Sequence, residues 1–368
     1  MKLAQRTGMI DSSGIRKVFN LAQKLENPIN LSIGQPDFDV PDEVKRAAIQ
    51  AIEAGFNKYT VTAGLPELRE KILAIYKERG YQGEEAMVTS GVSGGLMLCF
   101  LCLLDPGDEI IMSDPYFVMY KHLANFIGAR PVYIDTYPKF RLRAEAIEAV
   151  ITERTKAIIV NSPNNPTGIV YNEEEIRAIA DVAQRHNLLV ITDDIYDHFI
   201  YQPGLAPTIA TQYPNTLVLS GLSKTAAMTG WRIGFAMGPE QIIKAMTDLQ
   251  QYSFVCAPSF AQKAALVALD RNMEKEEAAY QRKRDLIYEG LKEDYKVEKP
   301  EGAFYIFPEA PGGDGDAFVL EAVANNVLIV PGSVFSERKS HFRLSFAASD
   351  ETIEQGVEVL CKLARKYR

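Results

Sequence analysis

The chain has 368 residues, of which 47% are hydrophobic and 24% charged, and its 40 basic and 48 acidic residues give a formal net charge of −8. This length and composition are ordinary for a globular protein of one large or two moderate domains with a substantial core. No basic block interleaved with aromatic residues occurs along the chain, which argues against a nucleic-acid partner.

The N-terminal stretch "MKLAQRTGMIDSSGIRK" lacks the apolar core of a secretory signal peptide. The longest apolar run, around "LMLCFLCLLD", is too short to cross a bilayer. We therefore expect a cytoplasmic protein that has no membrane partner.

Cys99 and Cys102, inside that apolar run, have the spacing of a metal or redox pair, but no second pair completes a tetrahedral site. The histidines form neither an HxxxH nor an HxH pattern. The sequence predicts cysteines that pack in the core and does not support a metal site.

From about Asp42 to Gly238 the sequence alternates between helical and strand-like segments. The expected strands, in chain order, are residues 109–113, 130–134, 156–160, 188–192, 216–220 and 232–237. Helical stretches lie between them, such as "NEEEIRAIADVAQRH" at 172–186, where apolar residues recur at helical spacing behind an acidic first turn. This alternation predicts an α/β fold with a mostly parallel sheet covered by helices on both faces.

Beyond about Glu274 the pattern changes to a long charged helical segment followed by "GAFYIFP", "NNVLIVPG", "HFRLSFA" and a terminal helix. This part is typical of a smaller α+β domain. We expect three parts: an N-terminal segment, 1–41, that contributes to the small domain, a large domain, 42–273, and the C-terminal small domain, 274–368.

Four short signals fall at the ends of expected strands, where open α/β sheets hold their ligands. "TSGVSGGL" (89–96) is a glycine-rich turn that opens a helix and suits a phosphate, although it fits neither the dinucleotide fingerprint nor a P-loop. "NSPNNPTG" (161–168) presents asparagine amides beside prolines. Asp193 ends a buried strand, and such a carboxylate needs a metal, an arginine or a protonated ring nitrogen as its partner.

The fourth signal is Lys224, which stands between two strand-like runs in "SGLSKTAAMTGWRIG" (220–234). A Walker-type motif requires glycine directly before its lysine, and Ser223 holds that place here. A lysine that is reachable and partly desolvated can form a Schiff base, because its pKa falls from ~10.4 towards neutrality. The spacing suggests a phosphate-bearing ligand near a reactive lysine.

These motifs, in this order, resemble the class I and II aminotransferases, fold-type I enzymes that depend on pyridoxal 5'-phosphate. The resemblance spans nearly the whole chain, through "INLSIGQPDF", "YTVTAGLPELR", "DPGDEIIMSDPYFVMY", "NSPNNPTG", "DDIYDHF", "SKTAAMTGWRIG", "GAFYIFP" and "HFRLSFA". It implies amino-group transfer from an α-amino acid to a 2-oxo acid of the 2-oxoglutarate type, a large-domain sheet of the seven-stranded type, and a homodimer with shared active sites.

The resemblance implies that Lys224 forms the internal aldimine with the cofactor and then moves the proton between the substrate Cα and the cofactor. Asp193 would pair with the protonated pyridinium nitrogen, and Phe117 would stack on the ring. Asn165 and Tyr196 would hold the phenolate oxygen. Asn165 is also expected to line the substrate site.

The resemblance assigns the remaining site residues to the phosphate and the substrate. Arg343 would bind the substrate α-carboxylate in a bidentate fork. Gly34 would line the substrate side. The expected phosphate ligands are Arg232, Ser223, the amides of Val92 and Ser93, and Tyr59 of the neighbouring subunit.

Two positions depart from the family pattern. Many relatives carry a serine at the position of Gly221 that helps to hold the phosphate, so we expect somewhat weaker cofactor retention here. Some aspartate-selecting relatives have a lysine at the position of Ser93. Its absence puts aspartate specificity in doubt, although Arg16 or another basic residue could serve instead.

Two other functions remain open. A lyase that catalyses β-elimination or decarboxylation could use the same scaffold, because the protein only chooses which bond aligns with the cofactor. Carbon–sulfur lyase relatives commonly show Asp-Glu-Ile-His where this chain has residues 193–196 as Asp-Asp-Ile-Tyr, which favours transamination. The second is a non-catalytic ligand sensor, since some transcription regulators contain an aminotransferase-like domain. Those regulators carry a winged-helix segment ahead of that domain, and we expect no room for one before the match begins near Ser13.

Overall fold

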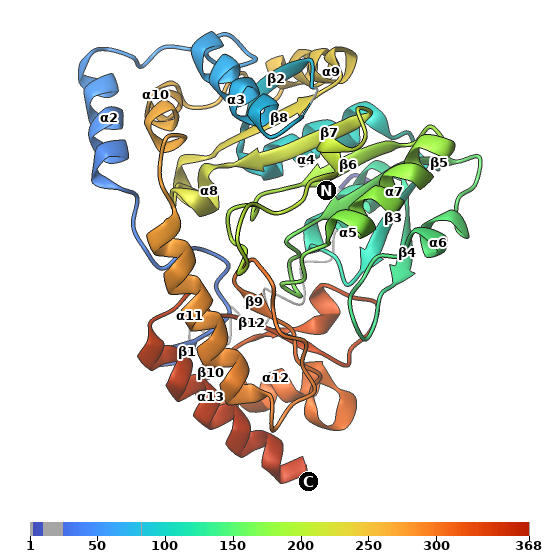
Figure 1. The fold of residues 1–368 in the computed structure, drawn as a ribbon, viewed down its shortest axis with the longest axis vertical. Coiled ribbons are helices and arrows are strands. Elements are labelled where there is room, and N and C mark those ends of the chain that lie inside the picture. Colours follow the sequence, from blue (N-terminus) through green and yellow to red (C-terminus); the bar gives the residue numbers. More distant parts are fainter. Residues whose placement is uncertain (1–2, 10–24, 82, 368) are drawn as a thin grey trace.

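A seven-stranded sheet of strand order β2-β8-β7-β6-β5-β3-β4 is the centre of the computed structural model, which describes residues 3–9, 25–81 and 83–367 (Figure 1). β8 runs antiparallel to both of its neighbours, and the other neighbouring strands are parallel. The strands are β2 (Glu85–Ser90), β3 (Glu109–Asp114), β4 (Arg130–Asp135), β5 (Thr155–Asn161), β6 (Leu189–Asp193), β7 (Thr216–Gly221) and β8 (Ile233–Gly238). The predicted α/β fold with a mostly parallel sheet is confirmed.

The edge strand β2 is absent from the strands expected from the sequence. Its segment, "EAMVTS", has only a short apolar centre and runs directly into the glycine-rich turn that begins at Gly91. The turn signal therefore hides the strand that precedes it.

Helices cover both faces of the sheet. Consecutive strand residues point to opposite faces, and both sets are apolar, so each face must be buried. In β6, Leu189 and Ile191 pack in the cluster that includes α4 and α9, whereas Val190 packs on the opposite face with α7. One face carries α4 (Gly91–Leu103), α5 (Val118–Ile127) and α9 (Glu240–Gln251); the other carries α6 (Ala144–Glu148) and α7 (Glu173–Arg185). The end of the sheet at β2 and β8 is covered by α2 (Asp42–Glu53), α3 (Pro66–Glu78) and α10 (Ser259–Ala268).

The C-terminal part lies below the large sheet in Figure 1 and contains two small sheets, β1-β10 and β11-β12-β9. Its elements are α11 (Glu274–Leu291), β9 (Tyr305–Ile306), α12 (Gly315–Ala324), β10 (Val327–Leu328), β11 (Val330–Pro331), β12 (Phe342–Ser345) and α13 (Asp350–Ala364). Short 3-10 helices lie at Gln5–Met9, Ile209–Thr211, Thr229–Trp231, Pro311–Gly313, Gly332–Val334 and Arg365–Tyr367.

The N-terminal strand β1 (Ile29–Asn30) belongs to this lower part, since it pairs in parallel with β10. The next residue, Leu31, accepts a hydrogen bond from the Ser345 amide at the end of β12. Residues 29–31 are thus tied to the C-terminal segments. The division of the chain at 41/42 and 273/274 stays a prediction.

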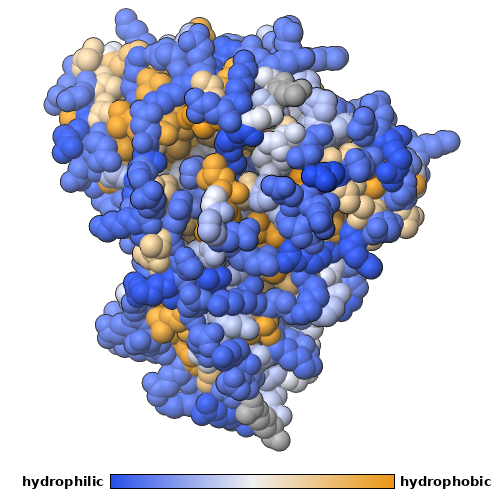
Figure 2. All heavy atoms as spheres, in the orientation of Figure 1, coloured by the Kyte–Doolittle hydropathy of each residue, from blue (hydrophilic) through white to orange (hydrophobic). Residues whose placement is uncertain are grey.

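The face shown in Figure 2 is mainly hydrophilic, with hydrophobic atoms gathered on its upper part over α2 and α10. Exposed apolar side chains on these helices include Ile49, Ile52 and Val267. In the described ranges, no helix combines the length and the apolar character that crossing a membrane demands. The cytoplasmic location stays a prediction.

Candidate active site

A cavity of about 400 Å³ opens at the carboxyl ends of β5, β6 and β7, where parallel strands deliver their terminal residues to one edge of the sheet. It brings together every predicted site residue except Tyr59. Its lining includes Gly34, Val92, Ser93, Phe117, Asn165, Asp193, Tyr196, Ser223, Lys224, Arg232 and Arg343.

Lys224 projects into this cavity from α8 (Leu222–Thr225), the single helical turn that follows β7. Its Nζ donates a hydrogen bond of 2.6 Å to the Gly34 carbonyl. Burial, and to a lesser degree the charge of Arg343, lower the pKa of Lys224 to about 8 against the opposing effect of Asp193. About a tenth of this amine is therefore neutral and nucleophilic at pH 7, far more than for a lysine of pKa ~10.4.

Asp193, the last residue of β6, is 3% exposed and faces the same cavity. Burial raises its pKa to about 6, while the Tyr120 hydroxyl and the Ile195 amide donate hydrogen bonds to its carboxylate at 2.6 and 3.4 Å. Two neutral donors do not balance a buried negative charge, so this carboxylate is suited to a cationic ligand atom.

Tyr120 was not among the residues predicted for the site. It lies in α5, three positions after Phe117, so both side chains face the same side of the chain there. That spacing in "DPYFVMY" is the sequence signal that could have indicated it.

Arg343 reaches the cavity from β12, which lies in the C-terminal part of the chain and not in the large sheet. Its guanidinium lies between the rings of Tyr305 and Phe335, at 4.4 and 4.5 Å from their centroids. Nη1 donates to Asn165 Oδ1 and Nη2 donates to the Ser32 carbonyl, both at 3.0 Å, and the buried Nε has no hydrogen-bond partner. The two rings fix the plane of the guanidinium, and its remaining N–H groups can donate to a carboxylate.

Tyr196 is buried beside Asp193, and its hydroxyl lies 2.8 Å from that of Tyr305. Tyr305 was not predicted as a site residue, although it lies in the motif "GAFYIFP". It contacts both Tyr196, which follows β6 of the large sheet, and Arg343, which lies in β12, so it connects the two parts of the chain that line the cavity.

The other end of the cavity has the features of an anion site. Val92 and Ser93 lie in the first turn of α4, where backbone N–H groups and the helix dipole favour negative charge. Arg232 is anchored beside them through hydrogen bonds to the carbonyls of Thr229 and Ser90 at 2.8 and 3.2 Å. Ser223 also lines the cavity.

Gly221 pairs with Gly234 across β7 and β8, and a Cβ added to Gly221 would lie 2.8 Å from Gly234 Cα and 2.9 Å from the Ile233 carbonyl oxygen. These contacts are backbone, which cannot move aside as a flexible side chain would. The expected weaker cofactor retention stays a prediction, but the structure adds a steric reason for glycine here.

We expect Gly221→Ser to destabilise the protein, because overpacking of this kind costs about 1–3 kcal/mol. A lower midpoint of thermal unfolding, measured on the protein without cofactor, checks this. Gly230→Ser is the matched control, since no atom lies within 4 Å of its added Cβ. Equal unfolding midpoints for the two variants would contradict the steric argument.

Two predicted features lie away from the cavity, and a third falls outside the described part of the chain. Tyr59 is 83% exposed, and its predicted contact with a second subunit stays a prediction. Arg16 lies outside the described residues. Cys99 is buried and Cys102 half-buried in α4, where burial raises the pKa of both thiols.

Comparisons with known proteins agree with this geometry. The family model for aminotransferase class I and II matches residues 26–360. The chain is 39% identical to a probable aspartate aminotransferase of Methanocaldococcus jannaschii over 97% of its length and 98% of the relative's, and 34% identical to the aromatic-amino-acid aminotransferase 2 of Thermococcus litoralis over 100% of both. The structure of Thermus thermophilus aspartate aminotransferase with maleate superposes with a TM-score of 0.93 at 36% identity, covering 99% of each chain. The chain therefore belongs to the class I and II aminotransferase family and is an aminotransferase.

Proposed function

We propose that the protein is a pyridoxal-phosphate-dependent aminotransferase that moves an amino group from an α-amino acid to a 2-oxo acid of the 2-oxoglutarate type. The observation that carries the proposal is the content of one cavity: a lysine of pKa about 8, a buried carboxylate, and two arginines. Each matches one chemical need of the cofactor or the substrate.

The fit to the cofactor rests on residues at both ends of the cavity. Asp193 lacks a cationic partner among its hydrogen-bond donors, and a protonated pyridine nitrogen would supply one. Arg232 and the first turn of α4 would bind the phosphate, with Ser223 beside them. Phe117 would stack on the ring, while Asn165 and Tyr196 would hold its phenolate oxygen. When bound, the cofactor supplies an electron sink for the carbanion at the substrate Cα.

The chain's own residues would orient the substrate and move its proton. Arg343 would bind the α-carboxylate through its fork, which fixes the substrate in one orientation. Lys224, released from the Gly34 carbonyl, would take the proton from Cα with its neutral amine, which becomes an ammonium group. Gly34 and Asn165 would line the substrate side.

We also propose that a second copy of the chain completes the site. Segments 59–62 and 250–254 are joined by a hydrogen bond of 2.7 Å from Gln250 to the Thr62 carbonyl, and they expose Tyr59, Val61, Tyr252 and Phe254. The Phe254 ring lies 3.7 Å from the position of a Cβ on Gly94, within α4. This apolar patch therefore borders the proposed phosphate site, where Tyr59 of one subunit would serve the other.

The donor amino acid is set by the rest of the lining. Among the described residues, the cations that line the cavity are Lys224, Arg232 and Arg343, and each already has a proposed role. A donor with a second carboxylate, such as aspartate, would therefore need a cation from Arg16 or from the second subunit.

The absorption spectrum of the purified protein with pyridoxal phosphate tests the proposal. We expect a yellow band that bleaches when the donor amino acid is added and returns when a 2-oxo acid follows. Aspartate, phenylalanine and alanine, tried one at a time, identify the donor class. A band that persists while pyruvate or ammonia is released would show a lyase instead.

The lowered pKa of Lys224 predicts the pH dependence of cofactor uptake. Only the neutral amine attacks an aldehyde, so the uptake rate of the cofactor-free protein should rise between about pH 7 and pH 9 and then level off. An unperturbed lysine of pKa ~10.4 would keep gaining rate beyond pH 10. Asp193 titrates lower, at about 6. Stopped-flow absorption across this range checks the midpoint, and a midpoint near 10 would refute the desolvation of Lys224.

A further inference from the structure

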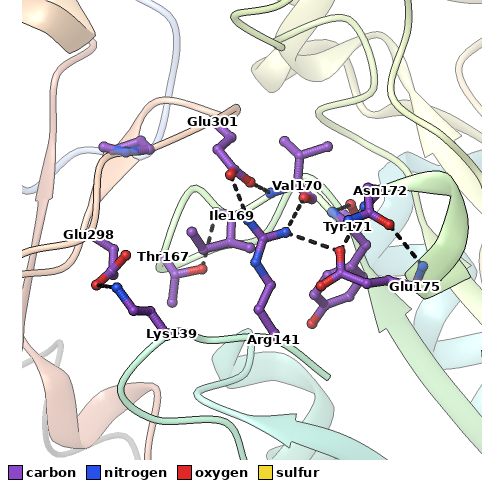
Figure 3. Close-up of polar contacts among 12 residues, drawn as sticks. Lys139, Arg141, Thr167, Ile169, Val170, Tyr171, Asn172, Glu175, Glu298 and Glu301 are labelled. Atoms are coloured by element: carbon purple, nitrogen blue, oxygen red, sulfur yellow. Dashed lines mark hydrogen bonds and ion pairs between the residues drawn. The ribbon is translucent and has the colours of Figure 1, made fainter. Parts of the chain in front are cut away.

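A second cavity, of about 320 Å³, lies where segments 139–141 and 169–175 meet segment 298–301 (Figure 3). Its lining carries four cationic side chains, and each is matched by a carboxylate. The pairs are Lys139–Glu298, Arg141–Glu175, Arg141–Glu301, Arg284–Asp285 and Lys299–Asp285, at 2.5–3.1 Å. Because the charges balance, this cavity is poorly suited to binding an anion.

The central feature of this cavity is a closed ring of hydrogen bonds, which we call the Arg141 clamp: Arg141, Glu301 and the backbone of Val170. Arg141 donates to Glu301 Oε1 at 2.5 Å and to the Val170 carbonyl at 2.6 Å. The Val170 amide closes the ring by donating to Glu301 Oε2 at 3.0 Å. Figure 3 shows the side chains of Arg141 and Glu301 approaching each other from opposite sides, with Val170 beside their contact. Charge-assisted bonds of this kind are the stronger ones in proteins.

Outside the clamp, Arg141 also bonds to the start of α7. Glu175 Oε2 accepts from Arg141 at 3.1 Å and from the Asn172 amide at 2.8 Å, and Asn172 caps the helix in return. Arg141 is therefore bonded to both ends of segment 170–175, which connects the Asn165 turn to α7.

The turn that presents Asn165 is bonded on its other side to the C-terminal part of the chain. The amides of Glu301 and Gly302 both donate to the Gly168 carbonyl at 2.8 Å. Gly302 packs so closely that an added Cβ would lie 2.6 Å from the Phe199 carbonyl oxygen and 2.7 Å from Val170 Cγ2. Segment 300–302 is thus held flush against the turn.

Three residues beyond Gly302 the chain reaches Tyr305, whose ring lies under the Arg343 guanidinium. Arg343 in turn donates to Asn165 Oδ1 at 3.0 Å. Segments 161–170 and 300–305 are therefore joined at two places. The clamp joins them at Val170 and Glu301, and Arg343 joins them at Asn165 and Tyr305.

We propose that the Arg141 clamp is a positioning device that holds the Asn165 turn in register with Tyr305 and Arg343, and thereby sets the affinity for the substrate carboxylate. Arg141 and Glu301 touch neither substrate nor cofactor, and they act through Val170 and Gly168. The part that concerns substrate affinity rests on the proposed function. The part that concerns the two segments does not.

The test compares Glu301→Gln and Arg141→Lys with Glu298→Gln. Arg141 and the Val170 amide donate to different oxygens of Glu301. A glutamine at 301 in this position would place an NH2 group against one of these two donors, so one of the two bonds is lost. A lysine at 141 keeps the charge but loses the fork that reaches two acceptors. Glu298→Gln makes the same chemical change three residues away, where its partner Lys139 is 70% exposed and stands outside the ring.

The first measurement is amide hydrogen exchange of residues 161–170 and 300–306 in the protein without cofactor. We expect exchange about tenfold faster in Glu301→Gln and Arg141→Lys than in the wild type, because a charge-assisted hydrogen bond is lost. Glu298→Gln should match the wild type. Unchanged exchange in both clamp variants would overturn the proposal, whatever the protein's activity.

The second measurement is the dissociation constant of an α-methyl amino acid, α-methylaspartate or α-methylphenylalanine according to the donor class, followed by the cofactor's absorption band. Such a compound binds like a donor but has no Cα hydrogen to lose. We expect about tenfold weaker binding in the clamp variants with an unchanged cofactor dissociation constant, since misplacement of a binding group lowers affinity at that group alone.

The two measurements separate the possible failures. Faster exchange with α-methyl amino acid binding equal to that of Glu298→Gln would overturn the positioning role and leave only a structural one. Loss of cofactor affinity in parallel with a lower unfolding midpoint would do the same. A wild type that forms no absorption band refutes the proposed function, while the exchange data still decide whether the clamp holds the two segments.

Discussion

Lys224→Ala is expected to abolish turnover, with a loss of about 10⁴-fold or more, because in the proposed function this one amine would serve as both the nucleophile for the cofactor and the acid–base group at Cα. No other lysine lines the cavity among the described residues. The loss is measured as kcat in steady-state assays, which use the donor and acceptor that the absorption experiment identifies. Multiple turnovers by the variant would refute the assignment of Lys224.

Two further variants separate the amine from its charge. Lys224→Arg keeps a positive charge near Asp193 but has no accessible neutral form, so it should be as inactive as the alanine variant. Lys244→Ala is the control, since Lys244 is exposed on α9 and forms an ion pair with Asp248 on the same helix. We expect its activity to stay within about twofold of the wild type, as usual for surface substitutions.

Asp193→Ala is expected to retain the cofactor yet lower kcat by about 10²–10³, the usual cost of removing one preorganised electrostatic partner. Without the carboxylate, the ring nitrogen would lose its counter-charge and the cofactor would withdraw electrons less strongly. The Tyr120 hydroxyl would also lose its acceptor. The measurements are kcat in steady state and the cofactor dissociation constant by absorption titration. A near-normal kcat would count against the pairing of Asp193 with the ring nitrogen.

Asp194→Asn is the control for this substitution. Asp194 is the next residue and equally buried, but its two oxygens accept from the hydroxyls of Thr192 and Thr208 and it does not line the cavity. Burial raises its pKa to about 7. We expect Asp194→Asn to lower the midpoint of unfolding while kcat per folded molecule stays close to that of the wild type. A large kcat loss in both variants would mean that burial at this strand end, rather than ring pairing, explains the effect.

The sheet was largely predictable because strand signals are local. Six apolar runs of strand length, bounded by turn residues, matched β3 to β8, and the acidic first turn at 173–175 indicated α7. The edge strand β2 was missed because its segment is short and continues into a glycine-rich turn. Locating these strands along the chain does not require knowing which of them are neighbours in the sheet.

The partners of the site residues were not predictable, since they lie far apart in the sequence. Arg343 and Asn165 are separated by 178 positions, and Lys224 and Gly34 by 190. Tyr305 looks like an ordinary core aromatic in the sequence, and only its hydroxyl contact with Tyr196 distinguishes it. The spacing from Phe117 indicates Tyr120, but its hydrogen bond to Asp193 is visible only in the folded chain.

The amino-acid sequence was enough to predict the α/β class, the positions of most strands along the chain, and which polar residues stand at strand ends, because periodicity and turn chemistry are properties of neighbouring residues. Four features arise only in the folded chain: the lowered pKa of Lys224, the raised pKa of Asp193, the stacking of Arg343 between two rings and the Arg141 clamp. These depend on burial and on charges brought together from distant segments, and neither exists until the chain has packed.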